Sequence, residues 1–91
     1  MFAIPQGIAV DETRALVTDV SYYSDQGRVL AVDLATGDRA VLSDHSTGSG
    51  PQLVAPGGII RVGSFLLVAD RIQHAVLAID TQTGERVILS K

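Results

Sequence analysis

The sequence contains no cysteine, no tryptophan and no asparagine, and only 19% of its 91 residues are charged. Without cysteine the chain has neither a disulfide framework nor a thiolate metal site. The net charge of −3 argues against a nucleic-acid-binding protein. Hydrophobic residues make up 46% of the chain, which excludes disorder. The length allows one small domain.

The sequence also lacks a long hydrophobic run. The start, residues 1–7, has no basic region followed by an apolar stretch, so no signal peptide is predicted. The strongest apolar runs are far shorter than the roughly 20 residues that cross a bilayer. We expect a soluble chain with no membrane contact. The sequence assigns it to no particular cellular compartment. Six arginines against one lysine, with no asparagine, favour a bacterial source with a GC-rich genome.

The second half of the sequence repeats the first. Residues 5–8 and 16–19 recur 51 residues later, and residues 29–33, 36–39 and 42–43 recur 47 residues later. The change of offset places a four-residue insertion in the first copy, between Val20 and Arg28. Residues 1–91 therefore form one unit with a first copy at about 2–43, a connector at 44–55 and a second copy at about 56–91.

Each copy is predicted to form four short strands. They are 7–11, 15–19, 28–33 and 39–43 in the first copy, and 59–62, 65–70, 75–80 and 86–90 in the second. Gly37 and Gly84 stand where a tight hairpin needs a positive φ. The apolar runs are almost continuous, which indicates sheets covered on both faces. The expected fold is all-β, with two four-stranded antiparallel blades of a propeller.

Residues 70–80, with the sequence Asp-Arg-Ile-Gln-His-Ala-Val-Leu-Ala-Ile-Asp, resemble the core of an NHL repeat. The Pro-x-Gly-Ile stretches that begin at Pro5 and Pro56 are similar to the first strand of that repeat. The gluconolactonase and senescence-marker propellers share the blade pattern. The first copy departs from it by a longer turn at 21–27, and Arg61 stands where the first copy has Val10. The resemblance implies a six-bladed ring and leaves the activity open.

Two blades cannot close a ring, because each would leave one apolar face bare. If each bare face exposes roughly 500 Å², its hydration costs about 12 kcal/mol. Such faces mark an interface, and a head-to-tail contact has to close to avoid a filament. We expect the outer blade faces to join chains, with three chains in a six-bladed homotrimer and residues 46–52 as a flexible link. The alternative is that the 91 residues are a fragment of a longer propeller.

Candidate binding residues lie in three regions that we expect on one rim: the 20–28 insertion, the 70–74 turn and the 44–55 connector. Tyr22 and Tyr23 could stack on a sugar or anchor a peptide, or pack over the neighbouring blade. Arg61, on an innermost strand, is placed by a trimer three times around the axis, where it could hold a small anion. The alternative for Arg61 is a salt bridge to an aspartate or a solvated side chain.

Four aspartates, Asp19, Asp33, Asp70 and Asp80, close equivalent strands. They are expected to accept backbone hydrogen bonds from the turns that follow, the alternative being a calcium site at the axis. His74 is the fourth ligand-binding candidate. It matches the histidine of the repeat, and the alternative that we favour is a structural hydrogen bond.

No catalytic residue, cofactor or metal ligand is assigned. The leading function is a non-enzymatic binding or assembly scaffold, with its ligand on the loop rim or in the channel. The alternative is a metal-dependent lactonase-like hydrolase. The Glu, Asn and Asp set that the gluconolactonase resemblance implies has no counterpart in a chain without asparagine.

Overall fold

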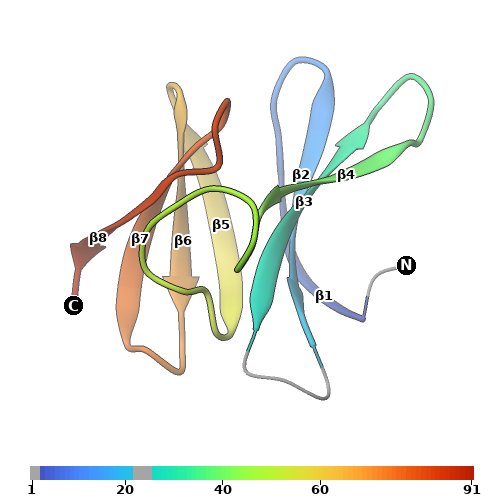
Figure 1. Cartoon of the computed structure of the whole chain (residues 1–91). Helices are drawn as coiled ribbons and strands as arrows, with labels where there is room; N and C mark the ends of the chain where they lie inside the picture. The colour runs from blue at the N-terminus through green and yellow to red at the C-terminus, as the bar shows by residue number, and fades with distance from the viewer. Residues whose placement is uncertain (1–2, 22–25) are drawn as a thin grey trace.

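The computed structural model describes residues 3–21 and 26–91, and this part of the chain folds into eight strands and no helix (Figure 1). The strands form two four-stranded antiparallel sheets, each in the order of the sequence. The first sheet contains β1 (Ile4–Val10), β2 (Arg14–Val20), β3 (Gly27–Asp33) and β4 (Arg39–Ser43). The second contains β5 (Pro56–Val62), β6 (Phe65–Asp70), β7 (Ala75–Asp80) and β8 (Arg86–Ser90). The all-β prediction with four strands in each copy is confirmed.

The main error in the predicted strands lies at the first strand of each sheet. β1 begins at Ile4 rather than Gly7, and β5 begins at Pro56 rather than Ile59. In both strands the pairing with the next strand shifts register just after the proline. Proline is tolerated there because β1 and β5 are first in their sheets and an irregularity releases the proline from donating a ladder hydrogen bond.

The two sheets have the same internal register. Leu16 lies opposite Ala31 in the first sheet, as Leu67 lies opposite Ala78 in the second. The third and fourth strands shift register at the same place, after Val29 and after Val76. Residues 51 apart up to the end of the second strand, and 47 apart from the third strand onward, are therefore structurally equivalent.

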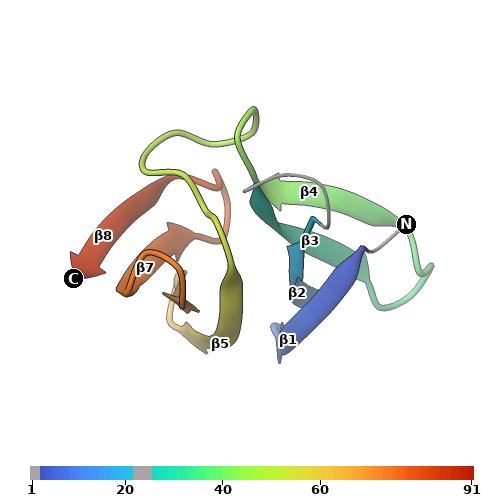
Figure 2. The same ribbon diagram turned by 90° about the horizontal axis from the view of Figure 1, so that it is seen from below.

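The sheets pack face to face, with β1 beside β5 (Figure 2). From this common side they diverge toward β4 and β8. One hydrophobic cluster fills the space between them: Leu16, Val29, Leu42, Leu53, Ile59, Leu66, Val68, Ala75, Leu77 and Ile79. The core thus lies between the sheets, which places the functional surfaces at the two ends of the sheets and on the two outer faces.

The packing joins unlike faces of the two copies. The first sheet contributes Leu16 to the core, whereas its equivalent in the second sheet, Leu67, lies on the face turned away. The second sheet contributes Leu66 and Val68, and their first-sheet equivalents lie on the outer side of that sheet. The two outer faces are therefore the two unlike halves of the inter-sheet contact that the chain already makes.

A close backbone approach joins the sheets between β1 and β5. The Thr18 hydroxyl donates to the Gly57 carbonyl oxygen at 2.7 Å and accepts from the Gly7 N–H at 2.9 Å. A Cβ on Gly7 would lie 2.5 Å from the Gly57 oxygen, which is closer than any Cβ contact tolerates. Glycine at position 7 is therefore required for this packing.

Gly7→Ala is expected to lower the free energy of unfolding by about 1–3 kcal/mol, because the added methyl group pushes the sheets apart. Urea denaturation followed by far-UV circular dichroism measures the change. An unchanged denaturation midpoint would contradict the contact.

Candidate functional site

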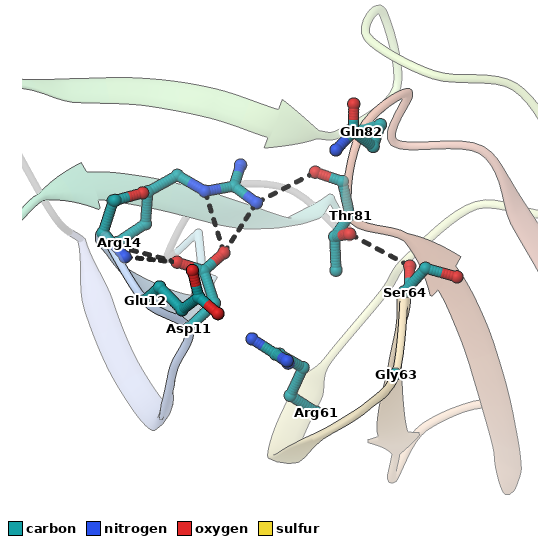
Figure 3. A pocket seen from close by; sticks show the side chains of 9 residues that line it. Asp11, Glu12, Arg14, Arg61, Gly63, Ser64, Thr81 and Gln82 are labelled. Atoms are coloured by element: carbon teal, nitrogen blue, oxygen red, sulfur yellow. Dashed lines mark hydrogen bonds and ion pairs between the residues drawn. The ribbon is translucent and has the colours of Figure 1, made fainter.

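A cleft lies between the two sheets at the end that carries the β1–β2 and β5–β6 turns (Figure 3). Its volume is about 530 Å³. Polar residues from both sheets line it: Asp11, Glu12, Thr13, Arg14, Arg61, Gly63, Ser64, Thr81 and Gln82. The lining carries charges of both signs and suits a small polar ligand or water.

One ion pair organises the cleft. The Nε and Nη2 atoms of Arg14 donate to the Oδ2 atom of Asp11 at 3.0 and 2.8 Å. The same Nη2 atom reaches the carbonyl oxygen of Thr81 in the second sheet at 3.1 Å, so Arg14 spans the cleft (Figure 3). Burial by itself raises the pKa of Asp11, but hydrogen bonds from the Thr13 N–H and the Arg14 guanidinium outweigh it and lower that pKa.

Arg61 and Glu12 are the charged side chains of the cleft that this ion pair does not use. Both are exposed. Arg61 projects from the end of β5 toward the cleft (Figure 3). The placement gives Arg61 access to a ligand in the cleft, where a guanidinium binds carboxylate or phosphate groups.

The described parts of the three expected loop regions meet at the opposite end of the sheets. The Gly27 N–H donates to the Leu53 carbonyl oxygen at 2.8 Å, which joins the 20–28 segment to the connector. The Gln73 side chain donates to the Gln52 carbonyl oxygen, which joins the β6–β7 turn to it. Tyr22 and Tyr23 lie outside the described residues. Arg61 is at the other end, so the structure separates it from these three regions.

Asp70 is the centre of the hydrogen bonds at this end. Its carboxylate is almost fully buried and accepts from the backbone N–H groups of Val54, Ala55, Ile72 and Gln73. Burial alone raises its pKa, but these hydrogen bonds, with one from the Gln73 side chain, outweigh burial and lower the pKa. The carboxylate therefore holds the end of the connector and the β6–β7 turn together.

Asp19, the equivalent of Asp70, is equally buried. It accepts from the Ala3 N–H at 3.2 Å and from the Arg28 guanidinium at 2.9 Å. Its Oδ1 atom has no hydrogen-bond partner within residues 3–21 and 26–91. Among the described residues, Asp19 thus combines one backbone donor with an ion pair to Arg28.

Asp33 and Asp80 organise the two hairpins at the cleft end. Asp33 Oδ1 accepts from the N–H groups of Ala35 and Thr36, at 2.8 and 3.1 Å. Asp80 Oδ1 makes the same pair of contacts in the second sheet. The carboxylates act as turn acceptors at equivalent positions.

His74 has a backbone feature of its own. Its φ of 52° is positive, an uncommon value for a residue other than glycine. The imidazole is exposed, and the expected structural hydrogen bond is not found among the described residues. His74 lines a hollow of about 500 Å³ on the outer face of the second sheet, together with Gly57, Gly58, Ala69 and Val76.

Arg86, a residue not predicted from the sequence to have a role, anchors the connector. Its side chain is 5% exposed. The guanidinium donates to the carbonyl oxygens of Asp44, Thr47 and Pro51 and to the Ser43 hydroxyl. The expectation of a flexible link at 46–52 is therefore wrong, because a buried cation holds the segment on the β7–β8 hairpin. The signal was present in the repeat, which has arginine at both equivalent positions, 39 and 86.

Within the part of the chain that the structure describes, no three His, Cys, Asp or Glu side chains come close enough to hold a metal ion. The described residues also include no helix that is long and apolar enough to span a membrane. No protein-family model matches the sequence, and the search of curated proteins finds no similar sequence.

Arg86→Ala is expected to lower the free energy of unfolding by about 1–3 kcal/mol, because several carbonyl oxygens lose their donor. Arg71→Ala, an exposed arginine of the neighbouring turn, is the control and should change it by less than about 0.5 kcal/mol. Urea denaturation measures both. Equal effects of the two substitutions would contradict the anchoring role.

Acid should weaken the fold through the carboxylates with lowered pKa values, those of Asp11, Asp44, Asp70 and Asp80. A lowered folded-state pKa gives stability that is present above the unfolded-state pKa of about 4 and is lost as the pH falls through the folded-state pKa. The urea midpoint should therefore fall below about pH 4. Asp70→Asn should be less stable at neutral pH and show a smaller fall, and an equal fall would contradict the assignment.

Proposed function

We propose that the chain is a non-enzymatic assembly scaffold: two blades of an NHL-type β-propeller that closes a six-bladed ring as a homotrimer. The observation that carries the proposal is the packing of unlike sheet faces. The outer face of the second sheet is equivalent to the inner face of the first sheet. The outer face of the first sheet is equivalent to the inner face of the second sheet. A second copy can therefore dock by repeating the contact already made inside the chain.

The outer faces have the composition of an interface. Paired residues of neighbouring strands point to the same side, so the register identifies each face. The outer face of the first sheet carries Ile8, Val10, Val17, Leu30 and Val32. The outer face of the second carries Ile60, Val62, Phe65, Leu67, Val76 and Val87. Ile8, Val10, Ile60, Val62 and Val87 are more than half exposed in the single chain, whereas Val17 and Leu30 are already buried there. Contiguous apolar surface of this kind is typical of protein–protein contacts.

The hollow on the outer face of the second sheet supports the same docking. Gly57, Gly58 and Ala69 line it. Their equivalents in the first sheet, at positions 6, 7 and 18, form the surface on which the second sheet places its Gly57 backbone. In the ring, the equivalent backbone of the next copy, at Gln6, fills the hollow.

The ring also has a place for a ligand. The sequence predicts a small anion, a sugar or a peptide on the loop rim or in the channel. Arg61, exposed in the cleft on the first strand of its sheet, is the side chain that we assign to an anion.

Multi-angle light scattering of the purified chain tests the scaffold. The expected mass at micromolar concentration is three times the 9.6 kDa of one chain. Gly58→Ala is a focused variant, because a Cβ at this position meets no atom within 4 Å in the single chain. It should fold normally, yet clash with the Gln6 backbone of the next copy and dissociate at about tenfold higher protein concentration or more.

A wild-type chain that stays monomeric at micromolar concentration would overturn the proposal and favour a fragment of a longer propeller. A mass that rises without limit would indicate a filament and would also contradict the closed ring. An assembled Gly58→Ala chain with unchanged dissociation would contradict the repeated docking geometry.

A further inference from the structure

The polar cleft inside the chain has a counterpart between copies, and the counterpart is lined by different residues. We propose that Val62 and Phe65 of one copy pack against Val10 and Leu34 of the next copy and form an apolar seam in place of the polar cleft. The inference rests on the head-to-tail assembly proposed above. It adds the residues that distinguish the contact between copies from the contact within one chain.

One wall of the seam follows from the second strand pair of each sheet. Arg14 lies opposite Asp33 in the first sheet, and Phe65 lies opposite Asp80 in the second, so Phe65 is the equivalent of Arg14. Val62, which lies opposite Phe65, is likewise the equivalent of Asp11. The ion pair on the first-sheet wall of the cleft is therefore replaced by an apolar pair on the outer face of the second sheet.

The other wall comes from the first sheet, and it too has apolar residues where the cleft has charged or polar ones. Val10 lies opposite Ala15, as Arg61 lies opposite Leu66, so Val10 is the equivalent of Arg61. The N–H of Leu34 donates to the carbonyl oxygen of the β1–β2 turn, as that of Thr81 does to the β5–β6 turn. Leu34 is therefore the equivalent of Thr81, whose carbonyl oxygen receives Arg14 inside the chain.

All four side chains are open in the single chain. Phe65 is 44% exposed, Val62 and Leu34 are each 54% exposed, and Val10 is 59% exposed. Each replaces a charged or polar residue of the cleft, and the two walls come from the two outer faces. All four replacements put an apolar side chain in place of a charged or polar one, on both faces of the proposed contact. The two faces therefore suit each other as apolar partners.

The difference between the two contacts selects the order of the sheets. If two first sheets met, the Asp11–Arg14 pair would be covered by the apolar side chains of Val10 and Leu34 and lose water, with only the backbone carbonyl oxygen of Leu34 as a new polar partner. If two second sheets met, Phe65 would be placed against the charged Arg61. Only alternation of first and second sheets satisfies both the polar cleft and the apolar seam.

Substitutions that convert one wall of the seam to the residues of the cleft provide the test. The double variant Val62→Asp and Phe65→Arg should raise the protein concentration at which the assembly dissociates by tenfold or more, measured by light scattering on dilution. Addition of Val10→Arg and Leu34→Thr, which converts the other wall as well, should recover assembly at least in part. Ile72→Asp, at an exposed apolar residue of the β6–β7 turn, is the control and should dissociate like the wild type.

Far-UV circular dichroism of each variant shows that the exposed substitutions leave the chain folded. An assembled wild type whose dissociation is unchanged by the double variant would overturn the seam and leave the scaffold standing. A monomeric wild type would overturn both. A fourfold variant that dissociates more readily than the double variant would contradict the pairing of the two walls.

Discussion

The constraint on which the rest of the structure depends is that both sheets are apolar on both faces, while the single chain covers one face of each. The covered faces are unlike, with Leu16 of the first sheet against Leu66 and Val68 of the second. Burial of apolar surface has no preferred partner, so the direction of the contact comes from shape, and here a close fit of glycine, threonine and backbone between β1 and β5 supplies it. When two repeats pack by unlike faces, each repeat keeps one free face. These two free faces are the same unlike pair, so they can pack on each other in the same way. The proposed ring is the closed solution to that geometry.

The two copies differ in side-chain chemistry where the two contacts need to be told apart. Their strands and register agree, and the carboxylates of Asp33 and Asp80 hold the same hairpin by the same two hydrogen bonds. At the cleft end, however, the first sheet carries the Asp11–Arg14 ion pair, whose arginine also donates to the second sheet, and the second sheet carries Val62 and Phe65 at the equivalent positions. A repeat protein whose interfaces were identical would have no means of distinguishing its own second sheet from that of another chain. The proposed seam gives the assembly that distinction at the cost of exposed apolar side chains in the free chain.

Buried charges hold the loops rather than the strands. Asp70 accepts hydrogen bonds from the connector and from its own turn, and Arg86 donates to carbonyl oxygens along the connector. Each charge meets several backbone dipoles, which offsets the loss of water. The connector between the sheets is thereby fixed at both ends, and the orientation of one sheet on the other is fixed with it.

The strands were predictable from sequence because short Val, Ile and Leu runs bounded by Asp, Gly and Thr form a local pattern, and its repetition confirmed each reading against the other copy. The strand starts at Ile4 and Pro56 were missed because each lies at or beside a proline. A strand accommodates proline through an edge position and a bulge, and these are properties of the whole sheet. Arg61 was found as a candidate residue, but its cleft was not, because the cleft joins turns that are about 50 residues apart in the sequence. The anchoring role of Arg86 was missed for a similar reason, as its partners lie more than 30 residues away. The sequence by itself determined the strands and their repetition, which depend on neighbours along the chain; only the tertiary structure decided which faces meet, because that choice depends on the fit between side chains that the sequence keeps far apart.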